Sequence, residues 1–253
     1  MPTVTFINHA TVLIRIDGTT LLTDPVFSKT VGFIIPRLRA PGISLNRLPD
    51  VDATLISHAD YDHLNLKSLR AIRRRNTQSI VLPRGLGSYG RRLDFPEVFE
   101  LDLWQKVEIR GARITCVPAR HSSSRIPWNR KRALACGYVI EAGDGTVYFA
   151  GDTGYGEHFK EIGRRFALDV VLLPIGAYKP ERWFRNIHLN PATAISAFRD
   201  LGARELVPIH WGTFKISDEP MREPPQWLRI EAERAGLAGR IHILENGDKY
   251  SWR

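Results

Sequence analysis

Four residues of the kinds that bind metal ions lie within one short stretch of the chain. They are His58, Asp60, Asp62 and His63, and they stand between an apolar segment and a segment with helical spacing. Imidazole and carboxylate ligands suit zinc, iron and manganese. A polar, solvated turn is the alternative interpretation, but such a turn does not require this concentration of ligands. The spacing therefore predicts a metal site at the end of a strand.

Three further residues of ligand type each follow a short apolar segment. They are His121, Asp152 and His210, and each stands just beyond a predicted strand. Any one of them alone could be an ordinary surface residue. Because strand ends gathered at one edge of a layered sheet come together, their occurrence alongside residues 58–63 predicts one shared centre.

The order of the predicted elements indicates a mixed α/β fold, in which many strands come first and strands then alternate with helices. Asp17-Gly18 and residues 143–145 predict tight hairpins, and residues 27–49 predict a long loop. Asn190 is the expected cap of one helix. Strands are predicted at 3–7, 11–16, 20–23, 52–57, 80–82, 98–101, 106–109, 113–118, 137–141, 146–150, 170–173 and 206–208, with two more at the C-terminal end, and helices at 64–75, 157–166, 191–201 and 225–235.

Short segments spread along the chain carry the motifs of one known family. They are residues 8–11, 22–28, 57–64, 118–121, 149–155, 173–178 and 209–214. These segments resemble the metallo-β-lactamase superfamily, and within it the branch that includes N-acylphosphatidylethanolamine-hydrolysing phospholipase D. The resemblance runs over nearly the whole chain. It implies a single domain over residues 1–253 with an αββα sandwich of two mixed β-sheets flanked by helices.

The resemblance implies a site for two divalent metal ions, with zinc as the first choice and iron or manganese as alternatives. It assigns three ligands to each ion and one carboxylate to both. The ligands of the first ion are His58, Asp60 and His121, those of the second are Asp62, His63 and His210, and the shared carboxylate is that of Asp152.

The resemblance also implies roles for side chains beside the metals. Asp62 or Asp152 would position the attacking water and accept its proton. His188 matches a position near the substrate in this branch, where it would stabilise charge; the alternative is a histidine at a helix entry with a satisfied hydrogen bond. His9 and Asp24 resemble residues that orient metal ligands, which such sites usually need.

One departure from the family motif concerns the first metal. The family has a second histidine where this chain has Asp60. A carboxylate is a harder ligand with a shorter reach, so it would favour iron or manganese, or leave the first site weakly occupied. If Asp60 instead turned away, the enzyme would work with one metal. Asn65 is a milder departure, because the branch often has aspartate there.

These residues predict hydrolysis by a metal-activated water. The branch implies a phosphodiester substrate, cleaved as by a phospholipase D. A lactonase or another hydrolase of cyclic esters or amides is an alternative, because the same metals would serve. A nucleic-acid-binding protein or nuclease and a non-catalytic relative are further alternatives. Residues 85–90 lack the Gly-Lys-Ser/Thr ending of a phosphate-binding loop.

The chain is strongly basic, with a formal net charge of +9 and a pI of about 9.8. Such a surface favours an anionic small-molecule or lipid substrate, although a solvated basic surface without a partner explains the charge equally well. The densest cluster is at residues 67–75, on a helix expected to be exposed. Because no recognised nucleic-acid-binding module is found there, we expect no specific nucleic-acid partner.

Compartment and membrane contact are predicted from composition. Cys116 and Cys136 are the two cysteines, so a disulfide framework is not indicated. The N-terminal residues lack the pattern of a signal peptide, and a cytoplasmic location is expected. No apolar run approaches the ~18 residues of a spanning helix. Residues 31–36 are an apolar part of the long loop, and would either contact a membrane peripherally or anchor the loop in the protein.

Overall fold

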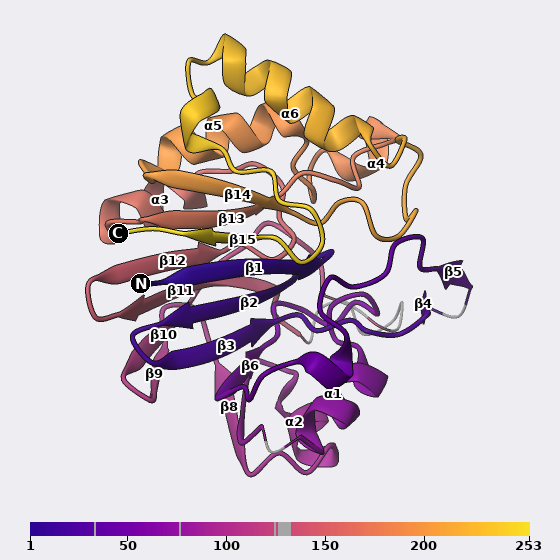
Figure 1. Cartoon of the computed structure of the whole chain (residues 1–253), viewed down its shortest axis with the longest axis vertical. Helices are drawn as coiled ribbons and strands as arrows, with labels where there is room; N and C mark the ends of the chain where they lie inside the picture. Colours follow the sequence, from indigo (N-terminus) through magenta and orange to yellow (C-terminus); the bar gives the residue numbers. More distant parts are fainter. Residues whose placement is uncertain (33, 76, 124, 126–132) are drawn as a thin grey trace.

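A computed structural model of the chain describes residues 1–253 except 33, 76, 124 and 126–132. Two large mixed sheets form its centre, and helices flank them (Figure 1). The predicted fold is confirmed. The first sheet has the order β15-β1-β2-β3-β6-β7-β8, with β1 (Thr3–Asn8), β2 (Thr11–Ile16), β3 (Thr19–Thr23), β6 (Ala53–Leu55), β7 (Ser79–Pro83), β8 (Glu97–Leu101) and β15 (Lys249–Ser251).

The second sheet runs from one edge to the other in the order β14-β13-β12-β11-β10-β9. Its strands are β9 (Lys106–Ile109), β10 (Ala112–Pro118), β11 (Cys136–Ala142), β12 (Gly145–Phe149), β13 (Val170–Pro174) and β14 (Glu205–Ile209). The helices are α1 (Leu66–Arg73), α2 (Gly87–Arg92), α3 (His158–Arg165), α4 (Glu181–Phe184), α5 (Pro191–Leu201) and α6 (Glu223–Arg234). In Figure 1, α3, α5 and α6 lie toward the top, and α1 and α2 lie toward the bottom.

The two-residue period of the strands builds the core. In β2, Val12 and Ile14 belong to the main buried cluster, whereas Leu13 between them packs in a separate cluster. In β7, Val81 belongs to the main cluster and its neighbour Leu82 to the cluster beneath α1 and α2. Successive side chains of a strand point to opposite faces. Alternate residues therefore fill the space between the sheets, and the others pack outside.

Strand direction determines where the chain can place a site. β1 and β3 are each antiparallel to β2, so they run in the same sense, and β6 is parallel to β3. In the second sheet β10 and β12 are each antiparallel to β11, and β13 and β14 continue parallel to β12. The strands that precede candidate ligands therefore end at a common edge of each sheet.

Local signals explain the helix boundaries. Oδ1 of Asn190 accepts a hydrogen bond from the backbone N–H of Thr193 at 2.9 Å, and Pro191 occupies the first turn of α5. This cap was predicted. The predicted helix at 64–75 begins two residues later, at Leu66, because Asn65 caps it through the N–H of Ser68 at 3.0 Å.

Several short elements differ from the sequence-based prediction. The expected loop at 27–49 contains a small hairpin, β4 (Thr30–Val31) and β5 (Ile35–Pro36), whose strands are too short for a periodic signal. α4 has four residues and was missed for the same reason. Of two strands expected at the C-terminal end, β15 forms, whereas Ile241 makes an isolated bridge to Leu206.

α2 was missed because two of its residues are glycines, which lower helix propensity. Packing explains why residue 90 is a glycine. A Cβ atom at Gly90 would lie 2.9 Å from side-chain atoms of Ile80 and Val98. The glycine therefore lets the helix approach the sheet closely.

Candidate active site

The seven predicted metal ligands meet at one end of the sandwich. Residues 58–63 follow β6, and His121, Asp152 and His210 follow β10, β12 and β14. His9 and Asp24 follow β1 and β3, and they join the same cluster. The structure therefore brings together the residues that the strand-end argument grouped, and it adds His9 and Asp24 to them.

Two glycines allow the loops to approach each other. A Cβ atom at Gly151, next to Asp152, would lie 2.5 Å from Cβ of Ser57. A Cβ atom at Gly176 would lie 2.2 Å from the carbonyl oxygen of His210. Larger residues at these two positions would push ligand-bearing segments apart.

Three residues surround the predicted first metal position. Oδ2 of Asp60 lies 3.6 Å from Nε2 of His58 and 3.6 Å from Nε2 of His121. Two ligand atoms about 2.1 Å from a tetrahedral ion are separated by about 3.4 Å. Asp60 therefore points toward both histidines and does not turn away from them. Its carboxylate occupies the place that the family motif gives to a second histidine.

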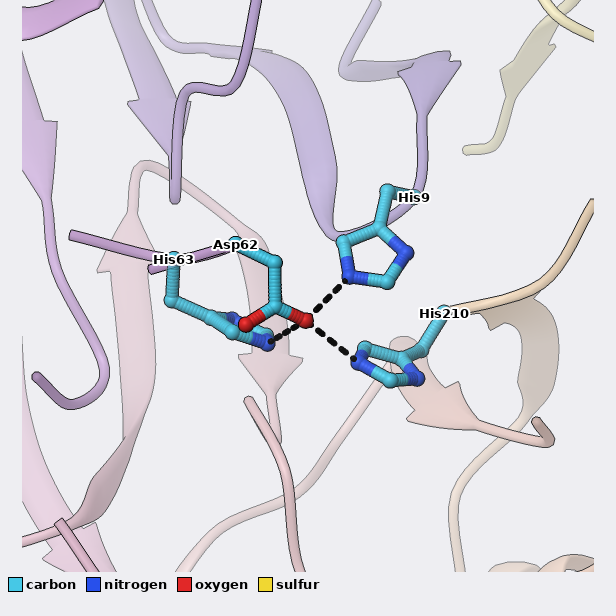
Figure 2. A group of neighbouring side chains, drawn as sticks. All are labelled: His9, Asp62, His63 and His210. Carbon is cyan, nitrogen blue, oxygen red and sulfur yellow. Dashed lines mark hydrogen bonds and ion pairs between the residues drawn. The ribbon is translucent and has the colours of Figure 1, made fainter. Parts of the chain in front are cut away.

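The second position lies around Asp62. Figure 2 shows His9, His63 and His210 directed toward one carboxylate oxygen of Asp62. Nε2 of His63 and Nε2 of His210 lie 3.5 and 3.6 Å from this Oδ2 atom. These separations again suit ligands of one ion. Nε2 of His9 is closer, at 2.9 Å, and makes a hydrogen bond instead.

Asp152 lies between the two groups. Its Oδ2 atom is 3.0 Å from Nε2 of His210, 3.2 Å from Nε2 of His63 and 4.0 Å from Nε2 of His58. Its Oδ1 atom is buried without a hydrogen-bond partner among the described residues. The position of the carboxylate suits the predicted shared ligand.

Three of the four histidine ligands are held through one ring nitrogen, whereas neither ring nitrogen of His210 has a hydrogen-bond partner among the described residues. Nδ1 of His63 donates to Asp24 at 2.7 Å, Nδ1 of His58 to Oγ of Ser57 at 2.9 Å, and Nδ1 of His121 to the carbonyl of Ile187 at 2.8 Å. The Nε2 atoms of all three are buried and make no hydrogen bond within the described part of the chain. Metal-binding histidines typically show this division between the two nitrogens.

The charges of the cluster also favour cations. Asp24 and Asp152 are buried, and Asp60 and Asp62 are partly exposed, which places four carboxylates in one centre. Buried charges need compensation. Two divalent ions carry a charge of +4, which equals four carboxylate charges of −1. The residues present therefore fit two such ions.

The pKa values of the candidate ligands reflect the negative charge of these carboxylates. Burial alone would lower the pKa of His210, but the charge of Asp152 outweighs it and raises the pKa to about 9. His63 follows the same pattern, with Asp152 and Asp62 raising its pKa well above the usual value against burial. Although burial favours neutral Asp152, the neighbouring His210 and His63 hold the pKa of its carboxyl well below the usual range. The carboxylates attract positive charge to the imidazoles.

His188 lies beside these ligands and is buried. Its Nδ1 atom is 3.9 Å from Oδ2 of Asp152 and has no hydrogen-bond partner in the described residues. The predicted alternative, a histidine with a satisfied ring hydrogen bond at a helix entry, therefore does not describe this nitrogen. Burial lowers the pKa of His188 to about 3, so the ring is neutral near pH 7.

Two residues of the site were not predicted. Ser57 donates from Oγ to Asp24 at 2.5 Å and so connects Asp24 to His58. Arg125 lies with its guanidinium 4.1 Å from the ring centre of Tyr61 and donates to the carbonyl of Leu64 at 2.5 Å. Ser57 stands directly before the predicted ligands, which was the available signal; nothing in the sequence pattern indicates Arg125.

A cavity of about 300 Å³ opens above the ligands. Asp60, Asp62, Asp152 and His188 contribute polar atoms to it. Its apolar lining comes from Val31 and Ile35 of the β4–β5 hairpin, Phe184 of α4, and Ile216. The long loop therefore contributes one wall of the site.

A site of histidines and carboxylates at the strand ends of two mixed sheets defines a metal-dependent hydrolase of the metallo-β-lactamase fold. The sequence model of the family described as "Beta-lactamase superfamily domain" matches residues 19–211. The chain belongs to this superfamily. A metal-dependent hydrolase of Methanopyrus kandleri is 30% identical to it over 98% of each chain.

Other relatives support the predicted branch. The chain is 34% identical to N-acyl-phosphatidylethanolamine-hydrolyzing phospholipase D 1 of Caenorhabditis elegans, over 89% of this chain and 68% of that protein. It is 32% identical to the mitochondrial enzyme of the same name from Saccharomyces cerevisiae, over 91% of this chain. The chain spans 52% of that yeast protein, and 64% of an uncharacterized Mycobacterium tuberculosis protein with 38% identity.

Solved structures share the fold. Igni18, a metallo hydrolase from Ignicoccus hospitalis, superposes with a TM-score of 0.77 at 23% identity, over 100% of this chain and 99% of that one. CmlA, a diiron β-hydroxylase from Streptomyces venezuelae, gives a TM-score of 0.73 at 23% identity, over 100% of this chain and 54% of that one. At these identities the likeness concerns the fold alone.

Proposed function

We propose that this hydrolase cleaves a phosphodiester of a lipid or other apolar alcohol, in a reaction like that of phospholipase D. The observation that carries the proposal is the composition of the cavity, with the candidate ligands and His188 on one side and apolar residues on the other. A diester places an anionic phosphoryl group next to a substituent that can be apolar. The relatives named as phospholipases D support the same substrate class.

We propose that two divalent ions occupy the two ligand groups. When bound, such ions supply Lewis acidity and generate a nucleophile from water near neutral pH. Zinc suits all the ligands. At the first position Asp60 adds a hard carboxylate to His58 and His121, a combination that also suits iron or manganese. CmlA, which shares the fold over 54% of its chain, is described as a diiron β-hydroxylase.

Side chains at the site would then have separate roles in hydrolysis. Asp62 is held by the hydrogen bond from His9 and is placed to orient the attacking water and to take its proton; Asp152 is the alternative acceptor. The water oxygen bonds to phosphorus, an ester P–O bond breaks, and the proton passes to the leaving alkoxide. Neutral His188 can donate a hydrogen bond to the phosphoryl oxygen.

A substrate panel tests this function. The metal-loaded protein is incubated with bis(4-nitrophenyl) phosphate, with N-acylphosphatidylethanolamine in detergent micelles, and with an N-acyl homoserine lactone. We expect turnover of the two diesters and its loss in Asp152→Asn. Turnover of the lactone alone would overturn the phosphodiester proposal in favour of the lactonase alternative. Loss of that lactone turnover in Asp152→Asn would still support a catalytic metal centre that includes Asp152.

We further propose that an anionic lipid surface is the partner of the face that carries the cavity mouth. The side chain of Ile34, in the β4–β5 hairpin, is 85% exposed, and that of Trp183, in α4, is 63% exposed. In Figure 1 the hairpin and α4 lie on the same side of the molecule. Arg182 and Arg185 flank Trp183 and are exposed. Exposed apolar side chains beside cations suit contact with anionic lipid.

A further inference from the structure

A second cleft, of about 390 Å³, lies between α1 and α2. It shares no lining residue with the cavity above the candidate metal ligands. The residues that line it are Arg70, Arg73, Arg74, Arg92, Leu93 and Asp94. Four arginines and one aspartate therefore line a single opening.

Most of these guanidinium groups have no partner. Nε of Arg73 donates to the backbone carbonyl of Asp94 at 2.6 Å. The side chains of Arg70, Arg74 and Arg92 make no hydrogen bond or ion pair with the residues that the structure describes. The ten residues that the structure does not describe include no aspartate or glutamate. By contrast Arg91, next to Arg92, lies 3.9 Å from a carboxylate oxygen of Glu100.

Helix ends explain only part of this arrangement. Cations are favoured at helix C-termini, and Arg70 and Arg73 lie in the last turn of α1 as Arg92 does in that of α2. That effect acts on each helix separately and does not require the two ends to face one opening. Like charges brought together repel one another, and salt only partly screens them. An anion in the cleft would remove this repulsion.

We propose that the α1–α2 cleft binds the phosphate group of an anionic ligand. Guanidinium groups present paired N–H donors that match phosphate oxygens, and several of them converge here. α1, which is about 12 Å long, lies between the ligand loop and this cleft: it begins after the ligand loop, and its last turn carries Arg70 and Arg73. The cleft is therefore a site for a phosphate that is not the one hydrolysed.

Titration calorimetry of the metal-loaded protein with inorganic pyrophosphate at low salt tests the proposal. The variant Arg70→Gln/Arg74→Gln removes two unpaired guanidinium groups from the cleft. Its matched control, Arg164→Gln/Arg229→Gln, removes two exposed helical arginines of α3 and α6. We expect the cleft variant to bind pyrophosphate at least tenfold more weakly than the wild type, and the control to bind like the wild type. Both variants should retain the metal content of the wild type.

Vesicle flotation identifies the source of the phosphate. Vesicles of phosphatidylcholine with phosphatidic acid are compared with pure phosphatidylcholine. If only flotation with phosphatidic acid falls in the cleft variant, the ligand is a lipid headgroup; if only pyrophosphate binding falls, it is a soluble phosphate. Equal behaviour of the cleft variant and the control with both probes would overturn the proposal. The result is independent of turnover, so a failed phosphodiester assay would leave it standing.

Discussion

Asp24 and His63 form a fully buried pair in which Nδ1 of the imidazole donates to Oδ2 of the carboxylate at 2.7 Å. The same carboxylate accepts from Oγ of Ser57, which in turn accepts from Nδ1 of His58. One aspartate therefore orients a histidine from each of the two ligand groups. Such outer partners fix the ring orientation and raise ligand basicity.

Asp24→Asn should weaken metal binding by about 10–100-fold, because the amide offers an N–H where His63 needs an acceptor. Competition with a chelator measures the affinity. Asp17→Asn is the matched control, since Asp17 is exposed in the β2–β3 turn and also has a positive φ. Equal affinities in the two variants would show that Asp24 does not orient the ligands.

His188→Leu should lower kcat by about 10²–10³-fold, which is the usual effect of removing a hydrogen-bond donor to a charged transition state. Metal content should stay at the wild-type level. His188→Asn keeps an N–H near the position of Nδ1 and should recover part of the rate. If His188→Leu instead lost metal, His188 would be a ligand and not a substrate-facing donor.

Metal uptake should release protons near neutral pH. The charge of Asp152 overcomes burial and raises the pKa of His210 to about 9, so at pH 7 the metal-free ring carries a proton. A metal ion at Nε2 displaces it. Zinc added to metal-free protein in weak buffer at pH 7 should release at least one proton per chain, and less above pH 9. Uptake without proton release at pH 7 would contradict the raised pKa.

Contact of the exposed Ile34 and Trp183 with lipid can be tested with vesicles of phosphatidylcholine and phosphatidylglycerol. Ile34→Asp and Trp183→Asp should each reduce flotation severalfold, because a charge replaces a side chain that would enter the lipid. Ile230→Asp, at an exposed isoleucine of α6 (47% exposed), is the control. Unchanged vesicle binding of both Ile34→Asp and Trp183→Asp would exclude a lipid surface as the partner of this face. The neighbouring Phe33 belongs to the segment 31–36, for which membrane contact and anchoring of the loop were the two alternatives, and it lies outside the described residues. No helix in the described chain has the length and apolar character needed to cross a membrane.

Strands and ligands could be predicted from the sequence for the same reason. Alternating apolar residues mark strands such as β2, and ligand-type residues beyond strand ends, such as His121 and His210, must meet when those strands are packed in one direction. What could not be predicted depends on tertiary contacts. α2 packs closely on the sheet at Gly90, and Ser57 joins the site through Asp24, which is far from it in sequence.

The arginine-lined α1–α2 cleft could be predicted from the sequence only in part. The cluster at 67–75 was expected on an exposed helix, and Arg70 and Arg74 are indeed exposed. Arg92 belongs to α2, which periodicity did not reveal. The sequence could therefore indicate a basic helix, but it could not indicate that a second helix completes a cleft.

The metal content of the purified protein tests the central claim most directly. Elemental analysis of protein purified without added metal, before and after reconstitution, gives the equivalents per chain, and Asp60→His is analysed beside it. We predict two equivalents in the wild type, and a larger share of zinc relative to iron and manganese in Asp60→His than in the wild type, because an imidazole replaces a hard oxygen ligand. Absence of bound metal even after reconstitution would contradict the account.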